Sequence, residues 1–172
     1  MAGGDQILDG GACDVGVEST IIDCTGDVPK ILRPGAVTAQ MIEECTGLSV
    51  GGNFDDSNVD GAVADDVAGS QVIRVSGSLE AHYAPAATVV LDQTPVAGRG
   101  LIALANVATP DGVIRLAAPK TEEEFARVLY AALRAADDQG LETVVVQQPA
   151  GDGIAIAIRD RLKRAARGSA KN

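Results

Sequence analysis

Residues 121–147 read TEEEFARVLYAALRAADDQGLETVVVQ, in which a helix signal is followed directly by a strand signal. Thr121 and Glu124 stand at the two positions of a capping box, so they predict the start of a helix. Residues 143–147 form a short β-branched run that is typical of a buried strand. Between them, apolar side chains recur at helical spacing until Gly140 ends the pattern: Phe125, Val128, Leu129, Ala132 and Leu133.

The segments on either side extend this pattern. An amphipathic helix is predicted over residues 154–167, after a Gly-Asp-Gly turn at 151–153. Strands that alternate with helices predict an α/β fold with a small Rossmann-like parallel sheet. Aromatic residues make up only 2% of the chain, so we expect a core of Val, Ile, Leu and Ala with helices on both faces of the sheet. Three further short apolar strands are predicted, at residues 87–91, 100–105 and 113–117.

The first 48 residues carry weaker signals of mixed α/β structure. A short helix should open at Thr38 and end at Gly47, with Met41, Ile42 and Cys45 on one side. These elements are too few to close a core, so they resemble the tail of a larger domain. Short strands are predicted at residues 6–8, 18–24 and 30–32.

Composition therefore divides the chain into three parts. Residues 1–48 are expected to be the domain tail, and residues 87–172 a Rossmann-like C-terminal domain. Residues 49–86 are expected to be a linker or lid, because residues 49–78 are rich in Gly, Asp, Asn and Ser and show little periodicity.

Charge and cysteine content exclude several classes of protein. The net charge is −10, and residues 1–78 hold 13 acidic and 3 basic side chains, so direct nucleic-acid binding is not expected. No apolar run is long enough to span a membrane and no signal peptide opens the chain, so we expect a cytoplasmic protein. Cys13, Cys24 and Cys45 fit no metal-site spacing, and we expect them to be buried and reduced.

Residues that could carry chemistry gather near the N-terminus, in GVEST at residues 16–20 and LRPG at residues 32–35. Glycine lets a ligand approach the backbone, and Ser19 and Thr20 supply neutral donors and acceptors. Arg33 supplies a planar fork suited to phosphate or carboxylate, at a strand end where α/β proteins bind ligands. From the residues alone, a hairpin with a surface arginine remains the favoured alternative.

Three patches together resemble one family. GVEST and LRPG are similar to the closing part of the YrdC-type domain of threonylcarbamoyl-AMP synthases. GSLEAHYAP at residues 77–85 resembles the linker of the long, two-domain form, and GDGIAIAIRDRL at residues 151–162 resembles its last helix. The patches follow the family's order, so the chain is identified as the C-terminal part of a long-form synthase.

This resemblance implies a reaction and roles for three residues. The family makes threonylcarbamoyl-AMP and pyrophosphate from L-threonine, bicarbonate and ATP, with Mg²⁺ carried on the ATP phosphates. The product serves the machinery that forms threonylcarbamoyladenosine in tRNA. By resemblance, Ser19 would contact L-threonine, Arg33 the nucleotide phosphates, and Tyr83 would fold over the nucleotide from the linker. No residue looks like an activated nucleophile, which fits a nucleotidyltransferase that works by positioning.

Other expectations concern what surrounds these residues. The family's Lys-x-Arg and Ser-x-Asn-x-Ser regions precede the matched part, so this chain alone is expected to be inactive. The alternative is a non-catalytic nucleotide-binding or regulatory module. His82 is more easily explained as a residue that orients the linker than as a general base. The basic residues of the last helix are expected to form a solvated face: Arg159, Arg161, Lys163, Arg164 and Arg167.

Overall fold

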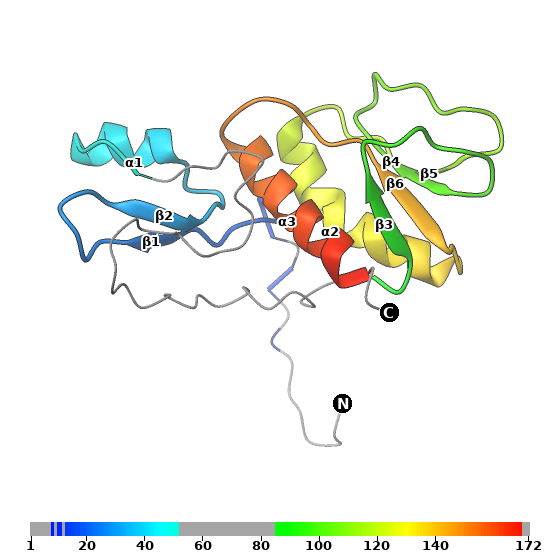
Figure 1. The fold of residues 1–172 in the computed structure, drawn as a ribbon, viewed down its shortest axis with the longest axis horizontal. Coiled ribbons are helices and arrows are strands. Elements are labelled where there is room, and N and C mark those ends of the chain that lie inside the picture. Colours follow the sequence, from blue (N-terminus) through cyan, green and yellow to red (C-terminus); the bar gives the residue numbers. More distant parts are fainter. Residues whose placement is uncertain (1–7, 9, 12, 52–84, 170–172) are drawn as a thin grey trace, which may run out of the picture.

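The computed structural model describes residues 8, 10–11, 13–51 and 85–169 (Figure 1). Near the N-terminus, β1 (Ile21–Asp23) pairs antiparallel with β2 (Lys30–Arg33). A carboxylate shapes the turn between them, because Asp23 Oδ1 accepts hydrogen bonds from the backbone N–H of Thr25 (2.9 Å) and from its hydroxyl (2.7 Å). Of the strand predicted at residues 6–8, all but Leu8 lies outside the described residues.

Helix α1 (Ala39–Thr46) follows the hairpin and has the predicted ends. The Thr38 hydroxyl oxygen accepts from the backbone N–H of Met41, and Gly47 closes the helix in the left-handed conformation with φ 71°. Its predicted apolar side is wrong in part: Ile42 is buried, whereas Met41 and Cys45 are exposed. The β1–β2 hairpin covers only part of the apolar side of α1, so Met41 and Cys45 stay exposed.

The C-terminal half contains the predicted parallel sheet, with strand order β3-β6-β4-β5. Central β6 pairs with both neighbours, so Val145 lies opposite Val90 on one side and Leu101 on the other. All three pairings in the sheet are parallel, which confirms the expected α/β class. The strands are β3 (Thr88–Leu91), β4 (Gly100–Ile102), β5 (Ile114–Ala117) and β6 (Thr143–Val146).

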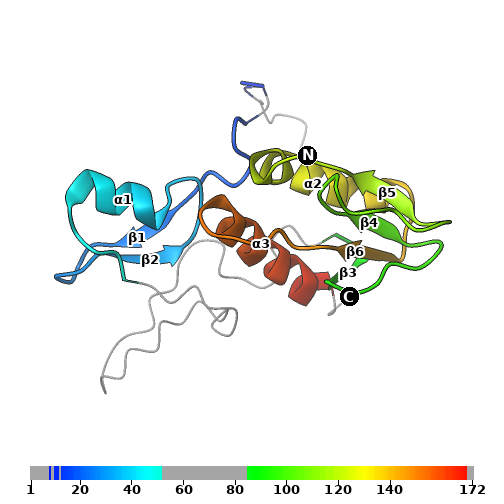
Figure 2. The ribbon, with the colours of Figure 1, turned by 90° about the horizontal axis from the view of Figure 1, so that it is seen from above.

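Two long helices, α2 (Glu122–Asp138) and α3 (Ile154–Ser169), lie side by side against one face of this sheet (Figures 1 and 2). The expectation of helices on both faces is therefore wrong for the described residues, since the opposite face carries a separate small cluster of Leu101, Ala103 and Val145. The largest fully buried side chains of the main core come from the helices and the facing strand positions: Phe125, Leu129, Ile158, Leu162, Ile102, Val144 and Val146.

Strands and helices alternate only in the second half of this domain. The connections from β3 to β4 and from β4 to β5 are loops, at residues 92–99 and 103–113, where the sequence had predicted no helix. Arg115 stabilises the second loop. Its guanidinium donates to the hydroxyl of Thr109 and to four backbone oxygens, those of Ala103, Leu104, Val107 and Ala117.

The cysteines differ from expectation in their burial. Cys13, Cys24 and Cys45 are free but exposed. Cys13 and Cys24 lie in irregular backbone before and after β1, and Cys45 lies on the outer side of α1. None of these positions faces the main core, so the small apolar thiol gains no burial there.

Candidate functional site

The two chemical motifs of the N-terminal segment lie against each other. A Cβ on Gly35 would lie 2.5 Å from the carbonyl carbon of Ser19 and 2.6 Å from the nitrogen of Thr20, so only glycine fits at this crossing. The Thr20 hydroxyl donates to the backbone oxygen of Val37 (2.9 Å), and the Val37 N–H lies 3.1 Å from the same hydroxyl oxygen. LRPG therefore crosses directly beside Ser19.

Pairing within the hairpin places Arg33 at the same end. Ile21 is the strand partner of Arg33, and the register shifts between Ile21 and Ile22. The backbone N–H of Ala36 donates to the oxygen of Glu18 (3.2 Å), which continues the contact beyond β1. Ser19 and Arg33, which resemblance singled out, thus come from adjacent strand ends.

Glu18 stabilises the bend before Ser19, a role that sequence reasoning did not assign. Its carboxylate oxygen accepts a 2.6 Å hydrogen bond from the backbone N–H of Gly16, which has φ 89°. Hydrogen bonds from the backbone N–H groups, foremost that of Gly16, lower the pKa of Glu18 below its ordinary value of 4.5. The spacing Gly-x-Glu was the available signal, because it is that of a carboxylate closing a glycine bend.

The same bend is anchored in the C-terminal half. Val17 is 2% exposed and belongs to the main core with residues of α2 and α3. A Cβ on Gly16 would lie 2.3 Å from the backbone oxygen of Ala126 in α2, so the chain passes that helix too closely for any side chain. The segment that leads into Ser19 is therefore packed on the C-terminal helices.

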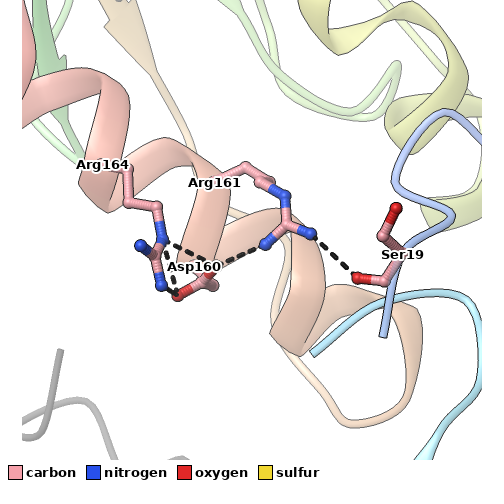
Figure 3. A network of polar contacts seen from close by, with 4 residues as sticks. All are labelled: Ser19, Asp160, Arg161 and Arg164. Carbon is pink, nitrogen blue, oxygen red and sulfur yellow. Dashed lines mark hydrogen bonds and ion pairs between the residues drawn. The ribbon is translucent and has the colours of Figure 1, made fainter. Parts of the chain in front are cut away.

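Arg161 of α3 joins this segment from the other side (Figure 3). Its Nη2 lies 3.4 Å from the backbone oxygen of Ser19, and its Nη1 lies 2.5 Å from Asp160. Arg164 also binds Asp160, with Nε to Oδ2 and Nη2 to Oδ1 distances of 3.1 Å. The Ser19 hydroxyl points away from Arg161, and the Ser19 residue is exposed.

The basic residues of α3 do not form the expected solvated face. The side chains of Arg161 and Arg164 are 11% and 14% exposed, and Arg159 donates to the backbone oxygens of Pro149 and Gly151, both at 2.9 Å. Arg167 is exposed as expected. The difference arises because α3 lies between the sheet and the N-terminal hairpin, so more than one of its sides is covered (Figure 2).

Arg33 is half-buried and electrostatically close to this cluster. Loss of hydration lowers the pKa of Arg33, and the positive charges of Arg161 and Arg164 lower it further. Asp160 and Tyr130 act in the opposite direction. A charged group in this environment is sensitive to the binding of an anion, which would stabilise the guanidinium.

A pocket of about 340 Å³ lies next to the LRPG turn, between the hairpin and the start of α3. Pro34 and Gly35 form one wall, and Asp152, Gly153 and Ile156 form the other. The Gly-Asp-Gly segment is a turn, as predicted, with positive φ at Gly151 and Gly153. Neither Ser19 nor Arg33 lines this pocket.

Two residues singled out by the sequence, His82 and Tyr83, lie outside the described residues. Within the described ranges, no group of three or more His, Cys, Asp or Glu side chains could hold a metal ion. Across the same ranges, none of the helices is long and apolar enough to cross a membrane.

Comparison with known proteins shows the family of this chain. Residues 37–167 match the model of the threonylcarbamoyl-AMP synthase C-terminal domain. The chain belongs to this family. It is 29% identical to the threonylcarbamoyl-AMP synthase of Bacillus subtilis over 180 residues, covering 94% of this chain and 49% of the relative. The Pyrococcus abyssi synthase is 30% identical over 178 residues, covering 92% of this chain and 48% of the relative.

A solved structure of the threonylcarbamoyl-AMP synthase family has the same fold. The crystal structure of P. abyssi Sua5 complexed with L-threonine matches with a TM-score of 0.65 and 28% identity, over 94% of this chain and 49% of that one. The chain thus spans about half the length of its relatives and corresponds to the C-terminal part of a long-form synthase. The sequence-based assignment of family and fold class is confirmed.

Proposed function

We propose that this chain is part of an enzyme that makes threonylcarbamoyl-AMP and pyrophosphate from L-threonine, bicarbonate and ATP, a nucleotidyltransferase reaction. The observation that carries this proposal is the crossing of GVEST and LRPG, with Gly35 against the Ser19 backbone. A P. abyssi relative has been solved with L-threonine. The product would then serve the machinery that installs threonylcarbamoyladenosine in tRNA.

Within this proposal the residues divide the work by position. Ser19, whose hydroxyl is directed away from the protein anchor at Arg161, contacts L-threonine. Arg33 contacts the nucleotide phosphates, where a guanidinium offers a planar fork and a permanent charge. Tyr83 covers the nucleotide from the linker. Catalysis would rest on positioning and on the exclusion of water from labile anionic intermediates.

Mg²⁺ in this proposal arrives with ATP, because its preferred ligands are oxygens and phosphate groups supply them. Its chemistry would be neutralisation of phosphate charge. The chain's own contribution is the cationic Arg33, together with the backbone that holds it beside Ser19.

The alternative is a non-catalytic module that binds a nucleotide at the carboxyl edge of the parallel sheet. Two side chains already occupy that edge. Asp92, with φ 53°, accepts from the Gln148 backbone (2.8 Å) and amide (2.6 Å), and the Arg115 guanidinium donors are bonded to the neighbouring loop. The geometry therefore favours the synthase reading.

One experiment separates the two readings. The 172-residue chain and a two-domain form with the N-terminal half supplied are each incubated with ATP, L-threonine and bicarbonate. We expect pyrophosphate release that requires all three substrates in the two-domain form and none in the chain alone. Substrate-dependent turnover by the chain alone would contradict its proposed incompleteness, and inactivity of both would favour the module.

A further inference from the structure

Helices α2 and α3 contact the segment that leads to Ser19 at three positions, Gly16, Val17 and Ser19 itself. Gly16 passes against the Ala126 backbone of α2, and Val17 is buried in the core shared by α2 and α3. Arg161 of α3 then reaches the Ser19 carbonyl oxygen at 3.4 Å. A substrate-contacting loop of one domain is thereby fixed by the other domain.

Arg161 is well suited to hold a backbone oxygen in place. One of its terminal nitrogens binds Asp160, and the other donates to Ser19, so the guanidinium plane is fixed by both. Asp160 is itself held by Arg164 through both carboxylate oxygens. The Arg161 and Asp160 side chains are 11% and 14% exposed, so water competes little for the ion pair between them.

The direction of the Ser19 peptide follows from this arrangement. Its carbonyl oxygen faces Arg161 of α3, and its hydroxyl points in another direction, away from Arg161 (Figure 3). We infer that Arg161 is a positioning residue: it fixes the Ser19 peptide so that the hydroxyl meets L-threonine, and through it the C-terminal domain sets threonine affinity. This inference rests on the proposed role of Ser19.

The first arm of the test measures amide hydrogen exchange in the 172-residue chain. The informative amides are Ala36, bonded to the Glu18 oxygen, and Val37, bonded to the Thr20 hydroxyl, because both report on the held segment. In Arg161→Ala we expect their exchange to be faster by about tenfold, the size expected for one charge-assisted hydrogen bond. Arg161→Lys should restore part of this protection.

The matched control is Arg134→Ala, which removes an exposed arginine from α2. It should leave exchange at Ala36 and Val37 unchanged, and the α2 amides should stay protected in every variant, which shows that the fold is intact. Unchanged exchange at Ala36 and Val37 in Arg161→Ala would overturn the inference.

The second arm measures kinetics in the two-domain form. Arg161→Ala should raise the KM for L-threonine by about tenfold and leave kcat within about twofold, since an interaction made equally in ground and transition states changes KM alone. If Ser19→Ala raises this KM and Arg161→Ala does not, the positioning inference fails while the role of Ser19 stands. If neither variant changes it, the proposed threonine contact of Ser19 fails, and the inference fails with it.

Discussion

The shape of the candidate site depends on a few single residues whose replacement would cause a clash or weaken a hydrogen bond. Gly35 allows LRPG to touch the Ser19 backbone, and Gly16 allows the chain to pass α2. The Glu18 carboxylate then stabilises the bend by accepting a hydrogen bond from the Gly16 N–H. Most residues of GVEST thus have structural roles, and together they fix the position of Ser19, which is exposed.

The Glu18 bond makes the bend dependent on pH. The folded-state pKa of Glu18 lies below 4.5, so its ionised form stabilises the fold above that value and the contribution disappears as pH falls through the folded pKa. Glu18→Gln should therefore lower the thermal midpoint at pH 7, and the difference from the native chain should shrink below pH 4.5. A difference that is equal at pH 7 and pH 3 would show that the charge plays no part.

At the scale of elements, local signals define the helices. The Thr121 hydroxyl oxygen accepts from the Glu124 N–H at 3.2 Å, and the Glu124 carboxylate accepts from the Lys120 N–H at 2.7 Å, one residue earlier than in the standard capping box. Helix α2 ends at Asp138, just before Gly140, which takes φ 65°. Such caps involve neighbours in sequence, so the pattern alone predicts them.

Loss of this cap should have a defined cost. Thr121→Ala should reduce the free energy of unfolding by about 1 kcal/mol, and Thr121→Ser should retain most of it because serine keeps the accepting oxygen. Urea unfolding measures both variants. Equal losses in alanine and serine would mean that the methyl group of Thr121 matters more than its hydrogen bond.

What the sequence could not predict depends on distant contacts. Arg161 and Arg164 were expected on a solvated face, but both are largely buried, and Arg161 contacts Ser19, which lies 142 residues away in sequence. The sheet was expected to have helices on both faces, but both helices of the described domain pack on one. Residue types and resemblance singled out Ser19 and Arg33, and the Gly-x-Glu spacing was an unused signal for Glu18. The contact of Arg161 with Ser19 had no sequence signal, because it depends on the docking of the bend on α2 and α3.

At the scale of the whole molecule, the C-terminal domain contains its own sheet and helix pair, while the hairpin and α1 depend on it. Val17 lies within the main core, so the N-terminal segment buries this side chain against residues of the C-terminal domain. The proposed boundaries, at residues 48 and 86, therefore separate a C-terminal part that we expect to fold alone from an N-terminal part that we expect not to.

Separate expression tests this dependence. Residues 79–172 should fold alone with a cooperative melt, because they contain the sheet and both helices, whereas residues 1–48 should show none. The isolated C-terminal part should be less stable than the chain by about 1–3 kcal/mol, since the space filled by Val17 would be open. A cooperative melt of residues 1–48 on their own would contradict this view.

The central claim is that Arg33 and Ser19 line the substrate site of a threonylcarbamoyl-AMP synthase. The most direct measurement is ATP affinity, by titration of the two-domain form, for Arg33→Ala, Arg33→Lys and the control Arg134→Ala. Loss of a charge-assisted hydrogen bond worth about 1.5–3 kcal/mol should weaken binding about 10- to 100-fold in Arg33→Ala, with partial recovery in Arg33→Lys and no change in the control. Native affinity in Arg33→Ala would contradict the claim.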